Sequence, residues 1–223
     1  MLELRLFAIS VYRTAVSLRV LGFLAATVTN LLLPVYLLSF RQAGAATAGV
    51  ILAGAAVGMF IAAQISGRMY DRFGPRAPTL IGLGLQTVVS LVFAFSTDTT
   101  SLFVIGIGTA LSGFAMGMWN VPNNGAMLGA TPPQFLGVGG AFTNVTRTLG
   151  NVLGQAMAAT VVAGVMVAQG FDIPLGELDE NPAAGVAFND GWRVAYLIAA
   201  GLTVALIALA TRLPGRAESN GQT

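Results

Sequence analysis

The chain contains no cysteine, no histidine and no lysine among its 223 residues, so all of its basic side chains are arginines. Without cysteine or histidine, thiol chemistry, zinc sites and a histidine proton relay are excluded. Charged residues make up 9% of the chain, whereas soluble domains carry about a quarter. The net charge of +2 is too small to indicate a nucleic-acid partner. No nucleophile–base set or metal cluster is visible, so we expect no enzyme activity, metal or cofactor.

Hydrophobic residues take the place of the missing charges, at 55% of the chain with a mean hydropathy of +0.77. A helix needs about 20 apolar residues to cross a bilayer. The stretches that qualify are Leu18–Phe40, Ala46–Met69, Pro78–Ser96, Ser101–Gly129, Gly137–Ala168 and Trp192–Arg212. We therefore expect an all-α membrane protein with six transmembrane helices within residues 18–212. A cytoplasmic linker is expected at residues 1–17 and a disordered cytoplasmic tail at residues 213–223.

The arginines indicate how the chain is oriented, because short cytoplasmic loops carry an excess of positive charge. One side of the expected membrane receives Arg5, Arg13, Arg68, Arg72, Arg76, Arg212 and Arg216, with Arg19 at its border. The other side receives Arg41 and Arg193, and also an expected long loop at residues 169–191 that holds five acids and no base. We therefore expect a multi-pass protein of the cell membrane with both termini in the cytoplasm and the acidic loop outside.

A charged turn between the second and third apolar stretches stands out in a chain with so few charges. Its notable residues are Gly67, Arg68, Asp71, Arg72, Gly74 and Arg76. Asp71 can pair with Arg72, with Arg76 or with the N-terminal end of a neighbouring helix. Such a pair would form a gate that latches the cytoplasmic side and breaks when helices separate. The alternative is a plain loop that only sets topology.

The fifth stretch carries four polar residues, Asn144, Arg147, Asn151 and Gln155, at spacings of 3, 4 and 4. These spacings place all four on one stripe of a helix. Arg147 is about ten residues inside the helix, or roughly 15 Å along its axis. An arginine at that depth is costly and usually faces a cavity or a partner. The stripe therefore either lines a substrate pathway, or holds helices together while Arg147 reaches toward the cytoplasmic side.

Asparagines lie close to a proline in two other stretches. Asn120, Asn123 and Asn124 surround Pro122, and Asn30 precedes Pro34. Their amides either line a pocket, which nearby flexible methionines would make adaptable to apolar ligands, or bond to carbonyls that the prolines free. With the stripe of the fifth stretch, they lead us to expect the first, fourth and fifth helices on the concave face, and the third and sixth at the periphery.

Pairs of glycines four residues apart predict that helices approach closely. The pairs are Gly54/Gly58, Gly113/Gly117, Gly125/Gly129 and Gly150/Gly154.

The charged turn resembles the loop between the second and third helices of a half of the major facilitator superfamily. That pattern is Gly-x-x-x-Asp-Arg-x-Gly-(Arg/Lys)-(Arg/Lys), and Pro75 departs from it at one basic position. Other segments resemble the second half of fourteen-helix drug:proton antiporters. These are residues 1–7, Pro122-Asn123-Asn124, Thr131-Pro132-Pro133, residues 147–154 and Gly191-Trp192-Arg193.

The resemblance implies half of a facilitator fold, built from two inverted repeats of three helices, in a multidrug efflux antiporter for small apolar or amphipathic molecules. Proton coupling needs a titrating group in the pathway, usually a carboxylate, and the expected membrane stretches offer none away from their borders. In the family these acids lie mainly in the N-terminal half. We therefore expect a C-terminal half that needs an N-terminal half, from the same gene or a separate chain. A scaffold or assembly subunit, a truncated remnant and a six-helix homodimeric carrier stay open as alternatives.

Overall fold

The computed structural model describes residues 9–180 and 182–213, and throughout these residues the regular structure is helical. Six helices in this part of the chain are long and apolar enough to cross a membrane. They are α1 (Ser10–Val35), α2 (Ala45–Phe73), α3 (Arg76–Ala94), α4 (Leu102–Gly129), α5 (Leu136–Ala168) and α6 (Pro182–Ala210). Short turns extend or precede three of them, namely η2 (Tyr36–Phe40), η3 (Pro133–Phe135) and η4 (Leu175–Glu180). The predicted all-α protein with six spans is confirmed.

Two boundaries differ from those expected. Helix α1 begins at Ser10 rather than Leu18, and α6 begins at Pro182 rather than Trp192. The expected loop at residues 169–191 is therefore shorter, and Asp190 lies on a helix. The start of α6 is held by burial of Ala184, Ala187 and Phe188, which outweighs the single charge at Asp190.

Where the structure describes them, the ends of the chain differ from the expected linker and tail. Residues 10–17 belong to α1, and Leu213 is buried in a cluster with residues of α1 and α6. The remainder of the expected linker and tail, residues 1–8 and 214–223, lies outside the described residues.

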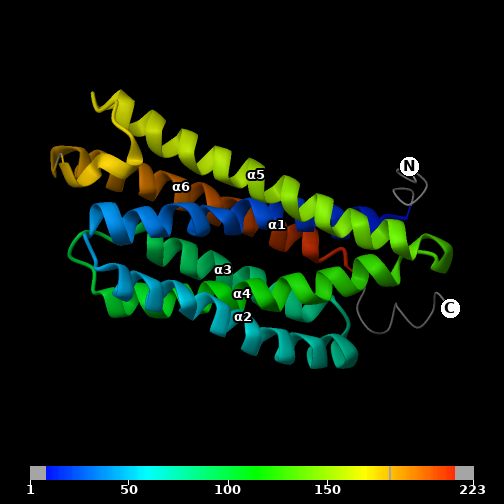
Figure 1. Ribbon diagram of the computed structural model, residues 1–223. Coiled ribbons are helices and arrows are strands. Elements are labelled where there is room, and N and C mark those ends of the chain that lie inside the picture. Colours follow the sequence, from blue (N-terminus) through cyan, green and yellow to red (C-terminus); the bar gives the residue numbers. More distant parts are fainter. Residues whose placement is uncertain (1–8, 181, 214–223) are drawn as a thin grey trace.

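The helices pack in a pattern that is unchanged when the first three are exchanged with the last three. Helix α2 packs on α4 as α5 packs on α1, and α3 packs on α4 as α6 packs on α1. Helices α3 and α6 pack on each other, and so do α1 and α4. The beginning of α1, the end of α6 and the α2–α3 and α4–α5 turns lie at one end of the bundle (Figure 1). This arrangement is that of an inverted repeat of three helices.

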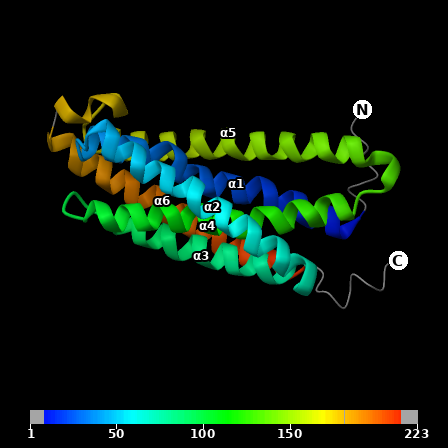
Figure 2. The same ribbon diagram turned by 60° about the horizontal axis from the view of Figure 1, so that its bottom comes forward.

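Helices α2 and α5 form opposite edges of the bundle, with α1, α4 and α6 between them (Figure 1). In Figure 2, α2 crosses in front of the bundle while α5 remains at its edge. They are also the least buried of the six spans. The prediction that α3 and α6 are the peripheral helices is therefore wrong for the isolated chain, in which α2 and α5 are peripheral. Each edge helix is covered on one side, by α4 or by α1 and α6, and presents its other side outward.

Glycines allow the edge helices to approach their neighbours at backbone distance, as the pairs predicted. A Cβ on Gly58 would meet the Ala110 carbonyl, and a Cβ on Gly113 would meet the Ala55 carbonyl, so α2 and α4 are in direct contact. The same holds between α5 and α1. A Cβ on Gly150 would lie 2.5 Å from the Val20 carbonyl oxygen. This packing is the usual way in which membrane helices associate without a hydrophobic driving force.

Candidate functional site

The polar stripe of α5 is formed as the spacing predicts, but its members face different surroundings. Asn144, Arg147 and Gln155 are exposed along the outer side of α5. Asn151 is half-buried, and its Oδ1 accepts a hydrogen bond of 2.8 Å from the Thr27 hydroxyl of α1. The stripe therefore borders the α1–α5 contact and opens outward from the bundle.

Arg147 lies well inside a helix that is longer than a bilayer core. Helix α5 has 33 residues, which corresponds to about 50 Å, against about 30 Å for the hydrocarbon region. Arg147 follows the start of α5 at Leu136 by about 16 Å. An exposed guanidinium at this depth needs a polar environment, from water, lipid headgroups or another polypeptide.

A buried arginine, Arg19, lies next to this stripe. Only 5% of its surface is exposed. Its Nε donates to the Thr143 carbonyl of α5 at 3.0 Å, and its Nη1 donates to Asn120 Oδ1 of α4 at 2.9 Å. The guanidinium carbon also lies 5.2 Å from the centroid of the Phe23 ring, within cation–π range. Arg19 of α1 thus joins α1, α4 and α5.

Sequence reasoning missed this role and placed Arg19 at the membrane border. The cause is the boundary of α1, because a helix that begins at Ser10 puts Arg19 more than two turns inside it. A signal was present in the sequence. Tyr12, Ala15 and Val16 follow helical spacing before Arg19, and all three are buried.

The asparagines of α4 connect that helix to α1. Asn120 accepts the bond from Arg19, and the amide of the fully buried Asn123 donates to the Ala15 carbonyl at 3.0 Å. Asn124 is half-buried, and among the described residues its Oδ1 has no hydrogen-bond partner. Asn120 and Asn123 therefore act as packing contacts in this conformation, and each bonds to α1 rather than to a carbonyl freed by Pro122.

A hollow of about 330 Å³ lies between α1, α2 and α4, and Asn30 is one of the residues that line it. Asn30 is exposed at this hollow, which is mostly apolar and also includes Pro34, Met59 and Met116. Methionine side chains are flexible and polarizable, so they adapt to apolar ligands of varied shape. The structure thus places Asn30 at a cavity of suitable size for a small apolar group, about one helical turn from Thr27, which bonds to Asn151 of the α5 stripe.

Gly74 shapes the charged turn. Its φ of 78° is favoured by glycine, and its N–H donates to the Tyr70 carbonyl at 2.8 Å, which closes the end of α2. The Tyr70 ring packs against α4, where a Cβ on Gly125 would lie 3.1 Å from it. The direction in which the chain leaves α2 is therefore fixed by the glycine that the motif requires.

The charges of this turn all face outward. Arg68, Asp71, Arg72 and Arg76 are exposed. Across residues 9–180 and 182–213, no ion pair joins Asp71 to Arg68 or Arg76. The Arg72 guanidinium lies 5.3 Å from the Phe73 ring, and a Cβ on Gly67 would meet nothing within 4 Å. A latch at Asp71 would therefore need a partner other than Arg68 and Arg76, or a different conformation of the chain.

Six apolar helices in an inverted repeat, with a polar stripe and a hollow between helices, define a multi-pass membrane protein of the transporter class. The sequence profile of the Major Facilitator Superfamily matches residues 3–155, more than half of the chain. The chain belongs to this superfamily, whose members bind small molecules and reside in a lipid bilayer.

Curated relatives include proteins with resistance functions in their names. The uncharacterized MFS-type transporter YcnB of Bacillus subtilis (strain 168) is 33% identical over 165 residues, 73% of this chain and 34% of that protein. Lincomycin resistance protein LmrB of Listeria monocytogenes is 28% identical over 166 residues, 73% of this chain and 35% of that protein. The multidrug resistance protein B homolog of Mycobacterium tuberculosis is 28% identical over 134 residues, 59% of this chain and 25% of that protein. The chain spans about a third of the length of the first two relatives.

Proposed function

We propose that this chain is the C-terminal half of an efflux transporter, which works together with an N-terminal half to export drugs or small amphipathic metabolites by proton antiport. The observation that carries the proposal is the exposed α5 stripe, with Arg147 well inside a membrane span. Exposure of an arginine to lipid costs about 2.5–3.5 kcal/mol or more at the centre of a span, and Arg147, about a third of the way along α5, bears part of this cost. A second half that covers the edge helices α2 and α5 would enclose the stripe in a polar pathway.

The hollow and the relatives support the proposed substrate class. A mostly apolar cavity with Asn30, Met59 and Met116 fits an apolar or amphipathic molecule. The names of two relatives refer to lincomycin resistance and multidrug resistance, and each relative is 28% identical to this chain over the matched residues. These likenesses support a drug-like substrate class without selecting one compound.

The acids of this chain are poorly placed for proton coupling. Within the described spans the carboxylates are Asp71, in the last turn of α2, and Asp190, in the first third of α6. Asp190 accepts a hydrogen bond of 3.0 Å from Gln169. A carboxylate in the middle of the pathway would have to come from the second half, which is one reason to propose that the halves act together.

The charged turn is proposed to face the cytoplasm and to act in gating. Its arginines, with the positive-inside tendency, support this orientation. Because Asp71 is exposed at the end of α2, we propose that its latch partner is a group of the second half. The contact would form in one state of the transporter and break in the other.

The experiment that tests this function compares the chain alone with the chain coexpressed with the N-terminal part of a relative such as LmrB. In vesicles with a pH gradient, the lone chain should move neither lincomycin nor ethidium above background, because half of the cleft and the coupling acid are missing. Coexpression should produce gradient-driven transport. Robust transport by the lone purified chain would overturn the half-transporter proposal and favour a homodimeric carrier.

Variants in the coexpressed complex separate the two proposed roles. Asp71→Asn should reduce turnover by about tenfold or more with little change in substrate binding, since it removes a latch rather than a pocket contact. Arg147→Ala should instead weaken binding or coupling. Asp172→Asn is the matched control, because Asp172 is exposed in the α5–α6 connection at the other end of the bundle. Equal loss in Asp71→Asn and Asp172→Asn would argue against a specific gate.

A further inference from the structure

The three consecutive residues Gly191, Trp192 and Arg193 of α6 lie in three different surroundings. Gly191 touches α5, where a Cβ would lie 2.9 Å from the Cα of Val162. Trp192 is fully buried and stacks on Tyr36, with their ring centroids 4.6 Å apart. Arg193 is exposed. Packing accounts for the glycine and the tryptophan, but it does not account for the arginine.

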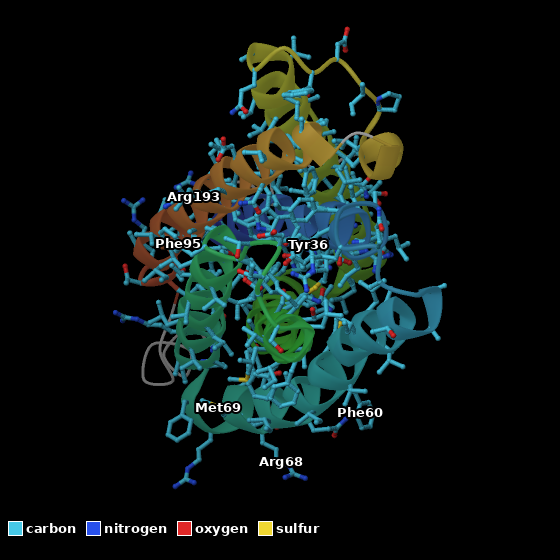
Figure 3. The ribbon with its side chains drawn as sticks, turned by 90° about the vertical axis from the view of Figure 1, so that its left-hand side faces the viewer. Tyr36, Phe60, Arg68, Met69, Phe95 and Arg193 are labelled. Atoms are coloured by element: carbon cyan, nitrogen blue, oxygen red, sulfur yellow. The ribbon has the colours of Figure 1, made fainter. Side chains whose placement is uncertain are left out.

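Arg193 lies over an aromatic ring at the edge of the bundle. Its guanidinium carbon is 4.8 Å from the centroid of Phe95, the residue that follows α3. Viewed from the end opposite the α2–α3 turn, Arg193 and Phe95 lie side by side at the outer edge of α3 and α6, whereas Tyr36 lies inside (Figure 3). Among the described residues, Arg193 makes no ion pair. Its positive charge is therefore not paired with a carboxylate in this part of the chain.

Phe95 is also one wall of an apolar groove between α3 and the start of α4. The groove has a volume of about 490 Å³, and its apolar lining residues are Val88, Leu91, Val92, Phe95 and Val104. Ser96 and Thr100 also line this cavity. The groove is therefore apolar along α3, with hydroxyls and a cation close to the end of that helix.

The depth of the groove in the membrane follows from the length of α3. This helix has 19 residues, or about 28 Å, which matches the thickness of the hydrocarbon core. Val88 and Val92, both exposed, therefore lie at the level of lipid chains, and Phe95 lies at the membrane boundary. Arg193, beside Phe95, is then at the level of the lipid headgroups.

We propose that this groove and Arg193 form a binding site for one anionic phospholipid. An acyl chain lies along Val88, Val92 and Phe95, and the phosphate lies at the Arg193 guanidinium. The acyl chain packs against the groove about as well as it packs against neighbouring lipids, so binding in the groove does not select a headgroup. The preference for a negative headgroup comes from the positive charge of Arg193. The nearby carboxylate of Asp98 lines a different cavity, with Gly185 and Asp190. The site does not depend on the proposed transport function or on which face of the membrane it occupies.

Competitive lipid retention on the purified chain tests the site. The detergent-solubilised chain is mixed with equal amounts of phosphatidylglycerol and phosphatidylcholine of the same acyl composition, and the bound lipids are counted by native mass spectrometry. Phosphatidylglycerol should be retained roughly fivefold over phosphatidylcholine, the factor expected for one cation at an anionic headgroup. Arg193→Gln should abolish the preference, and Arg193→Lys should keep most of it. Val92→Trp fills the groove and should lower the retention of both lipids.

Arg212→Gln is the matched control, because Arg212 is also exposed and follows α6 at the other end of the bundle. It should leave the preference unchanged. The proposal is overturned if the natural chain shows no preference, if Arg193→Gln retains it, or if Arg212→Gln removes it to the same extent. Elution of each variant as a single species on size exclusion confirms that the changes report on lipid binding and not on misfolding.

Discussion

Replacement of Gly154 by valine is expected to disrupt the packing of α5 on α1. A Cβ at this position would meet the Leu24 carbonyl and lie 2.9 Å from the Leu24 Cα. These are backbone atoms, so relief requires the two helices to move apart. Overpacking of this kind typically costs 1–3 kcal/mol, and we expect about 3 kcal/mol here because no side chain can yield. The midpoint of thermal unfolding in detergent should fall by about 6–12 °C.

The control for this variant is Gly164→Val on the same helix. A Cβ on Gly164 would meet nothing within 4 Å, so that substitution changes helix propensity alone. Its unfolding midpoint should stay close to that of the natural chain. Similar midpoints for the two variants would show that the α1–α5 approach is not as close as described.

Replacement of Arg19 by methionine should also destabilise the bundle strongly. Methionine has a similar length but no donor, so Asn120 Oδ1 and the Thr143 carbonyl would lose the hydrogen bonds that Arg19 supplies. The Thr143 carbonyl still accepts a hydrogen bond from the Thr146 hydroxyl, so Asn120 Oδ1 is the acceptor that is left without a donor. One such group costs about 1–3 kcal/mol and should lower the midpoint by roughly 2–12 °C. Arg13→Met is the control, because Arg13 is exposed on the same helix.

A double variant identifies the cause of the loss. Removing a buried charge can be neutral when its partners are replaced by apolar groups as well. Arg19→Met combined with Asn120→Leu should therefore recover part of the stability lost in Arg19→Met. If Arg19→Met unfolds at the same temperature as the natural chain, the buried guanidinium does not hold α1, α4 and α5 together.

The number of spans and several of their contacts could be predicted from sequence because they depend on local chemistry. Apolar runs long enough to cross a bilayer specify α1 to α6, and the glycines at Gly58, Gly113, Gly150 and Gly154 mark where helices touch. The start of α6 could not be read in this way. There, burial of Phe188 against other helices compensates for a charge that interrupts the apolar run.

The hydrogen-bond partners of the polar side chains could not be predicted from the sequence, for a different reason. Arg19 and its acceptor Thr143 are 124 residues apart, and Asn123 and Ala15 are 108 apart. Spacing along one helix shows which residues share a face but not which helix that face meets. The stripe on α5 was therefore predictable as a stripe, while the buried arginine beside it became visible only when three helices were placed together.

The account depends on six crossings that place the two ends of the bundle on opposite sides of the membrane, and cysteine labelling tests this most directly. The chain has no cysteine, so single cysteines can be introduced without background. Gln134, between α4 and α5, and Gly176, between α5 and α6, are both exposed. In intact cells, an impermeant maleimide should label Gly176→Cys, and it should label Gln134→Cys only after the membrane is opened. Labelling of both positions from the same face would contradict the six-span half-transporter.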